Sequence, residues 1–390
     1  MKILQITPSY KPAYIYGGPT MSVAKLCEAL VQHNLDLEVL TTTANGKTEL
    51  NVESGEKISV DGVPATYFKR ITKDHTHFSP ALLLGLREKI KEQKTKNKDL
   101  PPVIHIHSWW NLVTIFSCLM AKIYHIPVVL SPRGMLTAYT QNNRNSLLKS
   151  ILHTLIGKSL LRYCHIIASS EQEQQDLLQI IMPKSITIIP NLVSLPHEQG
   201  ARSKEQGTPF NLLFLSRIEE KKGLDILFEA LANLNIKWTL NIGGNGDEEY
   251  IKNLKLKAKN LKINDNIHWL GHINNQDKFE LMANHDLLVL TSHNENFANV
   301  VIESLSVGTP VLLSKQVGLS SYVAANDLGF VTDLNSNQIT TTLNDAYTNL
   351  GKRDRIRLSA SQMIKDDFNE EKLIKKYINL YQEILNLKSS

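Results

Sequence analysis

A chain of 390 residues, of which 42% are apolar and 21% charged, is long enough for two α/β domains with full cores or for one large domain. Its formal net charge of +5 suits an anionic ligand or an anionic membrane surface, and it argues against a nucleic-acid binder, which would carry a basic stripe interleaved with exposed aromatics. The three cysteines lack metal-type spacing, the first residues do not resemble a signal peptide, and no apolar run reaches the roughly 18 residues that span a bilayer, so we expect a cytoplasmic protein with buried thiols.

Short runs rich in Ile, Val and Thr alternate with helix-period segments along the first half of the chain, a pattern typical of buried parallel strands. These runs are KILQIT, LEVLTTT, ATYFKR, PVIHIH, PVVLSP, HIIASS and ITIIP. A polar stretch over 194–208 then interrupts the pattern with Gly, Pro and charge, and it predicts a domain boundary. We therefore expect an N-terminal Rossmann-like domain over 1–195, which the resemblance given below implies is the acceptor-binding domain.

The pattern restarts with NLLFLS, KWTLNIGG, NIHWLG, DLLVLTS and PVLLS, which predicts a second doubly wound parallel sheet over 208–368. The last segment, 369–390, repeats Leu373, Tyr377 and Tyr381 at helical spacing and predicts an amphipathic closing helix that packs back on the N-terminal domain. Ligands of such sheets bind outside the carboxyl ends of the strands, so we expect the site in the cleft between the two domains.

Several strands of the first domain end in residues suited to a ligand. Gly17 and Gly18 follow the first strand without Cβ atoms, so they either let backbone N–H groups approach an anion or form a flexible turn. His107 ends another strand at the expected cleft edge, whereas His105 on the same face fits buried packing. Trp109 fits either the core or a ring that stacks on a sugar.

Arginine and lysine follow further strands. Arg133 stands between a proline and a glycine, where it is either a solvated charge or a clamp for phosphate or carboxylate. Arg217 and Lys222 frame the first strand–helix junction of the second domain, where two cations can neutralise a diphosphate without a metal; a solvated loop is the alternative, and we expect it for Lys221. The glycine run around Gly244 lacks the third glycine of the dinucleotide fingerprint, so NAD is not expected.

Two glutamates, Glu295 and Glu303, flank the uncharged stretch NFANVVI. Glu295 falls in a loop and Glu303 inside the following helix, so at about 1.5 Å per residue their eight positions span roughly 12 Å. Such carboxylates cannot share a metal or a proton. They can hold opposite ends of a nucleoside diphosphate sugar, with the pyrophosphate at the helix N terminus between them, although the spacing also occurs by chance in many helices.

Four motifs together resemble those of the retaining glycosyltransferases of family 4, also described as glycosyl transferases group 1: GG after the first strand, HIH, SRIEEKKG, and ENFANVVIESLSVGTPV. The resemblance extends over essentially the whole chain. It implies the α/β GT-B fold, in which two Rossmann-like doubly wound parallel-sheet domains face each other across a cleft. It also implies a hexosyltransferase-type enzyme that takes a nucleoside diphosphate sugar as co-substrate and needs no cofactor or metal, in keeping with the absence of a D-x-D motif from the sequence.

The resemblance also implies roles for individual residues. Arg217 and Lys222 would bind the donor pyrophosphate, Glu295 would contact the donor sugar, and His107 would lie beside the transferred sugar as a fourth catalytic residue. Glu303 would hold the ribose. The further donor-binding residues expected are Gly17, Gly18, Gly244, Phe297, Ala298 and Asn299, and Arg133 and Trp109 are expected at the acceptor.

The chain departs from the family pattern at three places. Thr291 stands where a proline is common, Asn296 stands where a glycine often follows the first glutamate, and SPRGM replaces a more frequent T-x-H pattern. None of these changes removes a charged ligand group. They therefore bear on sugar and acceptor preference and leave the predicted activity in place.

Two basic segments bear on the acceptor. Residues 144–163 pair apolar with basic side chains at helical spacing, and this helix either packs against the first sheet or lies on a membrane that holds a polyprenyl-linked saccharide acceptor. Residues 86–98 are densely basic, and they form either a solvated face or a contact with an anionic lipid surface. We expect an enzyme of bacterial surface polysaccharide or lipopolysaccharide biosynthesis, with a saccharide or lipid-linked acceptor, at most peripheral to the inner membrane face. The alternatives are a nucleotide-sugar epimerase or phosphorylase of the same fold, or a non-catalytic sugar-nucleotide sensor; no nucleic-acid partner is expected.

Overall fold

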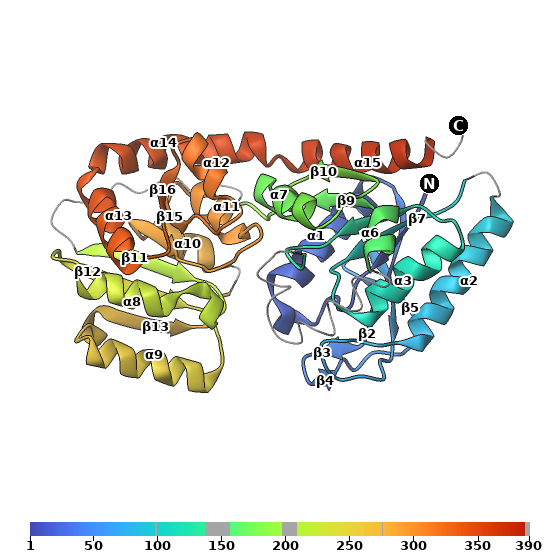
Figure 1. The fold of residues 1–390 in the computed structure, drawn as a ribbon, viewed down its shortest axis with the longest axis horizontal. Coiled ribbons are helices and arrows are strands. Elements are labelled where there is room, and N and C mark those ends of the chain that lie inside the picture. Colours follow the sequence, from blue (N-terminus) through green and yellow to red (C-terminus); the bar gives the residue numbers. More distant parts are fainter. Residues whose placement is uncertain (98–99, 137–156, 197–208, 275, 387–390) are drawn as a thin grey trace. The chain divides into compact units, whose positions relative to one another are not determined.

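The computed structural model of the chain describes residues 1–97, 100–136, 157–196, 209–274 and 276–386. The chain forms two compact units, which we call unit 1 and unit 2 (Figure 1). Unit 1 combines Met1–Leu192 with the C-terminal segment Glu370–Ser390, and unit 2 is the continuous segment Val193–Asn369.

Unit 1 is built on a sheet of eight strands in the order β10-β9-β8-β7-β1-β2-β6-β5. All neighbouring strands in this sheet run parallel except β5, which is antiparallel to β6. The strands are β1 (Lys2–Ile6), β2 (Asp36–Thr42), β5 (Lys57–Val60), β6 (Val63–Phe68), β7 (Val103–His107), β8 (Val128–Ser131), β9 (His165–Ala168) and β10 (Ser185–Ile188). A separate antiparallel ribbon joins β3 (Ala44–Asn45) to β4 (Thr48–Glu49).

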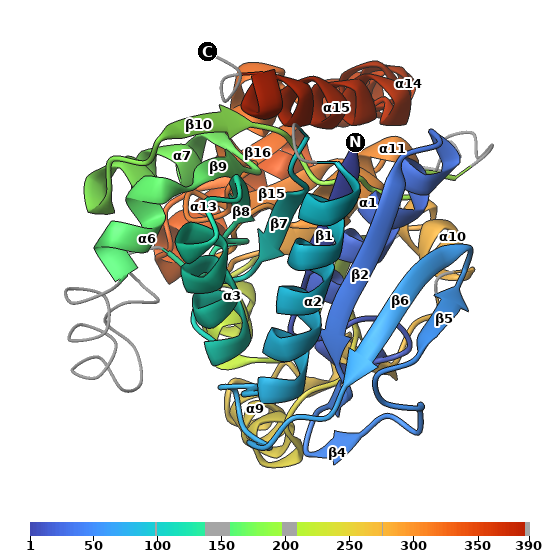
Figure 2. The same cartoon turned by 90° about the vertical axis from the view of Figure 1, so that its right-hand side faces the viewer.

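Helices cover both faces of this sheet. The 3-10 helix η1 and the α-helices of unit 1 are η1 (Tyr14–Tyr16), α1 (Gly18–Gln32), α2 (Pro80–Lys96), α3 (Leu112–Ile123), α6 (Lys158–Tyr163), α7 (Glu171–Ile180) and α15 (Glu370–Asn386). One core cluster joins the sheet to α1 and α15, and a second joins its other face to α2, α3, α6 and α7. Figure 2 shows α2 and α3 side by side over this second face.

Unit 2 has a sheet of six parallel strands in the order β13-β12-β11-β14-β15-β16. The strands are β11 (Phe210–Leu215), β12 (Trp238–Gly243), β13 (Ile267–Gly271), β14 (Leu287–Leu290), β15 (Val311–Ser314) and β16 (Gly329–Thr332). The helices are η3 (Glu220–Lys222), α8 (Leu224–Ala232), α9 (Glu248–Asn260), η4 (Asn264–Asn266), α10 (Lys278–Ala283), α11 (Asn299–Ser306), α12 (Ser320–Ala325), α13 (Ser336–Thr348) and α14 (Leu350–Asp367). Two doubly wound sheets confirm the predicted fold class.

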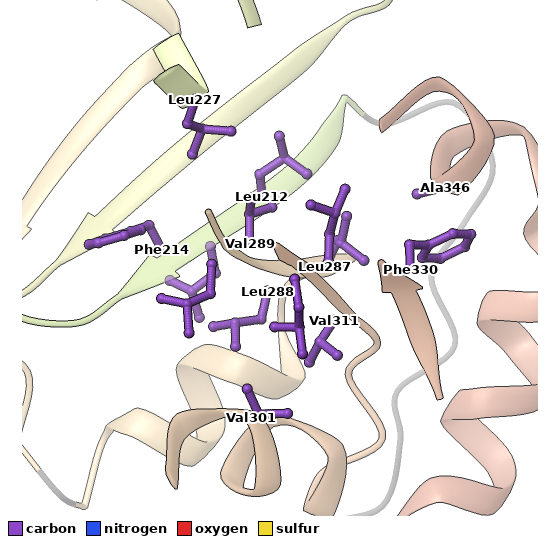
Figure 3. Close-up of a cluster of buried hydrophobic side chains, with 14 of the residues drawn as sticks. Leu212, Phe214, Leu227, Leu287, Leu288, Val289, Val301, Val311, Phe330 and Ala346 are labelled. Atoms are coloured by element: carbon purple, nitrogen blue, oxygen red, sulfur yellow. The ribbon is translucent and has the colours of Figure 1, made fainter. Parts of the chain in front are cut away.

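The strand order of unit 2 reverses direction at β11, because the chain adds β12 and β13 on one side and β14 to β16 on the other. Right-handed crossovers then place the helices that follow β11 and β14 on opposite faces of the sheet. Figure 3 shows this arrangement, with Leu227 of α8 and Val301 of α11 on opposite sides of the central strands. Both side chains are fully buried, so the central strands carry apolar residues toward both faces.

The helix α15 belongs to unit 1 although it closes the chain. Leu373, Tyr377 and Tyr381 are buried in the same core cluster as α1, at the spacing that the sequence predicts. The three cysteines, Cys27, Cys118 and Cys164, are buried and unbridged. Within the described ranges, no helix has both the length and the apolar character needed to cross a bilayer.

Candidate active site

The candidate donor site of unit 2 lies at the point where the strand order reverses. Arg217 and Lys222 belong to the loop that follows β11, and Glu295 belongs to the loop that follows β14, the next strand in the sheet. Open α/β sheets bind their ligands outside the carboxyl ends of the strands at this reversal. The cations and the first glutamate predicted from the sequence therefore share one edge of one sheet.

Glycines let the loops at this edge touch through their backbones. Gly223 has a left-handed backbone (φ +67°), and a Cβ there would lie 2.0 Å from the carbonyl oxygen of Thr291 in the loop after β14. Gly244, after β12, has φ +134°, and a Cβ would lie 1.9 Å from the carbonyl oxygen of Ser216. No side chain fits at either position, so the loops that follow β11, β12 and β14 form one closely packed surface.

Lys222 and Glu295 form an ion pair at this edge, although 73 positions separate them in sequence. The Lys222 side chain is 7% exposed and that of Glu295 is 20% exposed, so each charge depends on the other for most of its stabilisation. The backbone of Glu295 is held on both sides: its N–H donates to Gln316 O (3.1 Å), and its carbonyl accepts from Gly318 N (2.8 Å). These two hydrogen bonds fix the backbone from which the Glu295 side chain reaches Lys222.

A second, more open group of charges lies in the same loop. Arg217 Nη1 is 2.6 Å from Glu219 Oε1, and Lys221 Nζ is 3.8 Å from Glu219 Oε2. Lys221 is half-buried rather than freely solvated, and burial together with the neighbouring Lys222 lowers the pKa of its ammonium group. The expectation of a plain solvent-facing lysine is corrected accordingly.

The helix α11 begins at Asn299, shortly after Glu295 in sequence, and its first backbone N–H groups are hydrogen-bond donors. Its N-cap is Ala298, which has a left-handed backbone (φ 65°) and carries no side-chain acceptor that could cap the helix. Phe297 is buried, so it presents its backbone rather than its ring to the site. The first N–H groups of a helix, which start here at Asn299, attract anions.

Glu303 lies in the second turn of α11 and pairs with a residue that the sequence reading missed. Lys278 Nζ, from the first residue of α10, is 2.8 Å from Glu303 Oε1, and both side chains are largely buried. No motif marks this lysine, because its partner is 25 positions away in another helix. The ribose-binding carboxylate expected from the sequence therefore carries its own counter-charge.

In unit 1 the strand order reverses between β1 and β7. Gly17 lies in the loop after β1 and caps α1 with φ 63° and ψ −134°, a conformation open to glycine almost alone. Gly18 is the first residue of α1 and has ordinary backbone geometry, with no atom within 4 Å of the position that a Cβ would take. The backbone conformation at Gly17 therefore requires glycine, whereas a side chain could be accommodated at Gly18.

His107 ends β7 as predicted, but its side chain is fully buried. Its Nε2–H donates to Gln5 Oε1 (2.7 Å), which leaves Nδ1 to accept from Arg133 Nε at 3.4 Å. Burial, with smaller effects of His105 and Arg133, holds the pKa of His107 well below its usual range, so the ring is neutral. Both ring nitrogens of His107 therefore contact protein groups, Gln5 and Arg133, and its expected place beside the transferred sugar stays a prediction.

Arg133 follows β8 and has a left-handed backbone (φ 52°). Besides the contact with His107, its Nη1 donates to Asn191 Oδ1 (3.0 Å). A small cavity beside the guanidinium is lined by Ser131, Asn191 and Glu173 among other residues. Burial lowers the pKa of Arg133, and Tyr377 and Glu173 oppose that shift. The guanidinium is thus a partly enclosed charge fixed by hydrogen bonds, rather than a solvated loop residue.

Glu173 secures the loop that carries Arg133, and the sequence reading missed it. Its Oε1 accepts from Gly134 N (2.7 Å), and its Oε2 accepts from Ser169 N (2.7 Å) and Ser169 Oγ (2.9 Å). The sequence holds a signal for it, because Ser170 and Glu173 stand at the spacing of a capping box, and Ser170 Oγ does accept from Glu173 N (3.1 Å). The carboxylate reaches beyond the helix start to join the loops after β8 and β9.

Trp109 is fully buried in the core cluster with α2 and α3, so its ring has no face exposed for a sugar. The expectation that it stacks on an acceptor is corrected to a core role, the other alternative that its sequence position left open. The expected membrane-surface helix over 144–163 falls mostly on residues 144–156, which lie outside the described residues.

Two Rossmann-like units in one chain, with cations and paired carboxylates at the strand reversal of the second, define the class of GT-B glycosyltransferases. Two family models match adjacent parts of the chain: Glycosyltransferase Family 4 over residues 16–196, and Glycosyl transferases group 1 over residues 197–363. The chain belongs to the family 4 glycosyltransferases.

Relatives and solved structures agree with this assignment. An uncharacterized glycosyltransferase of Methanocaldococcus jannaschii is 24% identical and covers 98% of both chains. Sucrose-phosphate synthase from Thermosynechococcus elongatus has a similar fold, with a TM-score of 0.78 at 18% identity, over 99% of this chain and 100% of that chain. HepE from Anabaena, solved in complex with UDP-glucose, has a TM-score of 0.72 at 20% identity, over 98% of this chain and 100% of that chain.

Proposed function

We propose that this glycosyltransferase moves a hexose from a nucleoside diphosphate sugar to a saccharide or lipid-linked saccharide acceptor with retention of anomeric configuration and without a metal. The observation that carries the proposal is the Lys222–Glu295 pair beside Arg217 at the strand reversal of unit 2. Cations suited to a diphosphate and a carboxylate suited to sugar hydroxyls lie within one short stretch of that edge. The binding of UDP-glucose by HepE, which shares the fold, supports a nucleotide-sugar donor.

The transfer breaks the bond between the sugar C1 and the β-phosphate oxygen and forms a bond from C1 to an acceptor hydroxyl. Negative charge develops on the departing diphosphate, and Arg217, Lys222 and the N–H groups at the start of α11 stabilise it. The proton of the acceptor hydroxyl passes to the leaving phosphate oxygen on the same face, which retains the configuration. Glu295 holds the sugar hydroxyls during this exchange, and Glu303 holds the ribose.

The residues of unit 1 serve the acceptor and the phosphates in this proposal. Arg133, enclosed by His107, Asn191 and Glu173, is a fixed cation for an anionic or hydroxyl-rich acceptor. The Gly17 N–H donates to Tyr14 O (2.9 Å), so in this proposal the N–H groups at the start of α1, from Gly18 on, serve the donor phosphates. The modest positive charge of the chain is consistent with work at the inner membrane face, on bacterial surface polysaccharide or lipopolysaccharide.

Thermal unfolding against a panel of nucleotides tests the donor. UDP, GDP and ADP and their hexose esters are added one at a time, with a chelator present and absent. A ligand at about 100-fold its Kd stabilises a protein by roughly 2.7 kcal/mol, which shifts the melting temperature by a few degrees. We expect one base to be selected and the shift to be the same with chelator.

Product analysis then separates the candidate reactions. A transferase consumes the selected donor only with a saccharide acceptor, and NMR of the new linkage reports the retained configuration. Turnover without acceptor would indicate an epimerase, a requirement for free phosphate would indicate a phosphorylase, and binding without turnover would indicate a sensor. Any of these three results, or a shift that the chelator abolishes, contradicts the proposal.

A further inference from the structure

Glu219, in the charged loop of unit 2, contacts a cation of the proposed donor site although the proposed reaction gives this carboxylate no task. Its Oε1 lies 2.6 Å from Arg217 Nη1, and its Oε2 lies 3.8 Å from Lys221 Nζ. All three side chains are half-exposed, with exposed fractions of 35%, 47% and 37% in the order Glu219, Arg217 and Lys221. The Glu219 carboxylate is therefore paired with Arg217, a cation that is proposed to bind the donor diphosphate.

The backbone explains why the two side chains meet. Ile218 is buried and pairs with Gly246 in a parallel β-bridge, and Glu219 has an extended backbone (φ −135°, ψ 152°). Alternate residues of an extended segment point to the same side. Ile218 turns inward, so Arg217 and Glu219 both turn to the outside, where the pair forms.

The two carboxylates that are proposed to hold the donor differ from Glu219. Glu295 and Glu303 are largely buried, and each has a proposed hydroxyl partner on the donor. Glu219 is more exposed and has no proposed hydroxyl partner, so its contribution to the proposed donor site is its negative charge. We propose that Glu219 is a counter-charge that weakens diphosphate binding and weakens it more for the product than for the donor; this inference rests on the proposed function.

Charge counting gives the direction of the effect. Arg217, Lys221 and Lys222 face Glu219 and Glu295, so this group carries a net charge of +1, and loss of Glu219 doubles it. A sugar ester of a diphosphate carries two negative charges. The free nucleoside diphosphate carries about three at neutral pH, because its terminal phosphate loses a second proton near pH 6. Coulomb energy scales with the ligand charge, so Glu219 acts about 1.5 times as strongly, in free energy, on the product as on the donor.

The consequence concerns product release. An enzyme whose cations grip a diphosphate without a counter-charge holds its trianionic product more tightly than its dianionic donor. Product release limits turnover in many enzymes. By lowering the affinity for the product more than for the donor, Glu219 keeps the nucleoside diphosphate from accumulating in the site.

The test compares Glu219→Gln with Glu220→Gln. Glu220 follows Glu219 directly as the first residue of η3 and is exposed, and its replacement removes the same charge from the chain without breaking the contact of Glu219 with Arg217. Binding is measured by calorimetry at low ionic strength for three pairs of probes: UDP with UDP-glucose, GDP with GDP-mannose, and ADP with ADP-glucose. The pair that the parent protein binds is carried forward to the variants, and the same product is assayed as an inhibitor of turnover.

An exposed ion pair contributes up to about 1 kcal/mol, which corresponds to about a fivefold change in affinity. We expect Glu219→Gln to tighten the donor by about threefold and the product by about fivefold, and to lower the inhibition constant of the product by the same factor. Glu220→Gln should change either affinity by less than about twofold, because that carboxylate is exposed and solvent and salt screen its charge. Added salt should reduce the difference between the two variants.

Two results overturn the inference separately. If the parent binds a nucleoside diphosphate and Glu219→Gln binds it equally or more weakly, Glu219 is a positioning partner of Arg217 and not a counter-charge. Equal tightening by Glu219→Gln and Glu220→Gln leads to the same rejection, because the effect would then come from overall charge. If the parent binds none of the six probes, the proposed donor chemistry fails, and the role of Glu219 fails with it.

Discussion

Both glutamates of the E-x7-E spacing carry a lysine as counter-charge: Lys222 for Glu295, and Lys278 for Glu303. A buried charge whose partner is removed is strongly destabilised unless another charge replaces it. In the proposed function the donor diphosphate is that replacement at Lys222, whereas the uncharged ribose cannot replace Glu303 at Lys278. The two glutamates are therefore expected to respond differently to the same substitution.

Glu295→Gln should lower kcat by about 100-fold or more and change the Kd of the donor by less than about threefold. The carboxylate that we propose holds the transferred sugar is lost, while Lys222, released from its partner, remains available to the proposed diphosphate. Steady-state kinetics and donor calorimetry on the same variant measure the two quantities. Unchanged kinetics would remove Glu295 from the site.

Glu303→Gln serves as the matched variant, because it makes the same chemical change eight positions along the chain. It should weaken donor binding by about tenfold or more, as expected for loss of a charged hydrogen bond of roughly 1.5–3 kcal/mol to the ribose, and should leave kcat at saturating donor within about threefold. A large fall in kcat with an unchanged Kd would reverse the roles that we propose for the two glutamates.

At the scale of residues, the sequence was sufficient to locate the charged motifs, but it did not reveal the residues that contact them in the fold. The E-x7-E and R-x4-K spacings are local, so Glu295, Glu303, Arg217 and Lys222 could be found along the chain. Lys278 could not, because its contact with Glu303 depends on how α10 and α11 pack. The burial of His107 could not be read either, since a polar residue at a strand end is compatible with both a site and a core.

At the scale of elements, the start of α1 separates the two glycines of the GG motif. Gly17→Ala should lower the free energy of unfolding by about 1–3 kcal/mol, because its backbone conformation is strained for any residue with a Cβ. Gly18→Ala should be neutral or slightly stabilising, since Ala is the better helix former and the space is open. Urea unfolding of both variants measures the difference, and equal effects would show that the turn relaxes.

The loop between β6 and α2 makes stability depend on pH through His77. Burial, and then the charge of Arg70, lower the pKa of His77 to about 4, and Arg70 also binds Glu49 at 2.8 Å in the β3–β4 ribbon. Between the unfolded pKa of about 6.5 and the folded value, the unfolded chain binds a proton that the folded chain does not, so stability falls as the pH falls. At pH 5 this histidine alone removes about 2 kcal/mol.

His77→Gln should therefore reduce the loss of unfolding free energy between pH 7 and pH 5 by about 2 kcal/mol relative to the parent. The exposed neighbour His75 provides the control, and His75→Gln should leave the pH dependence unchanged within about 0.5 kcal/mol. Urea unfolding at the two pH values, followed by tryptophan fluorescence, gives the numbers. The same pH dependence in parent and His77→Gln would mean that the histidine is not held neutral in the fold.

Elements were predicted well where their residues are strongly patterned. Apolar runs mark all the central strands of both sheets, because buried parallel strands need Ile, Val and Leu on both faces. In the two large sheets the sequence reading missed β5 and β16. β5 (Lys57–Val60) lies at the sheet edge and alternates exposed with half-buried residues, and β16 (Gly329–Thr332) is four residues long and begins with glycine. The two-residue strands β3 and β4 of the separate ribbon were missed as well. The start of α11 at a left-handed Ala298 was also beyond reach, since nothing in an alanine indicates φ above zero.

At the scale of the whole molecule, the chain order and the folding units do not coincide. Unit 2 is one continuous segment, whereas unit 1 needs its first 192 residues together with Glu370–Ser390. The helix α15 places seven apolar side chains in the core of unit 1: Leu373, Ile374, Tyr377, Leu380, Tyr381, Ile384 and Leu385. At about 1.5–3 kcal/mol for each buried side chain, this helix contributes about as much as the whole stability of an ordinary domain.

Fragments of the chain test this division. A fragment over 193–369 should fold cooperatively and bind the selected nucleoside diphosphate, because the residues at its strand reversal are all present. A fragment over 1–192 should expose the surface that α15 covers and aggregate, and it should recover a cooperative transition when 370–390 is joined to it through a flexible linker. In that joined fragment, Tyr381→Phe should cost about 1–2 kcal/mol, because the phenol lies 2.7 Å from the buried His105 Nδ1 and the ring nitrogen would lose its partner. A fragment over 1–192 that is soluble and unfolds cooperatively without 370–390 would show that α15 is dispensable to unit 1.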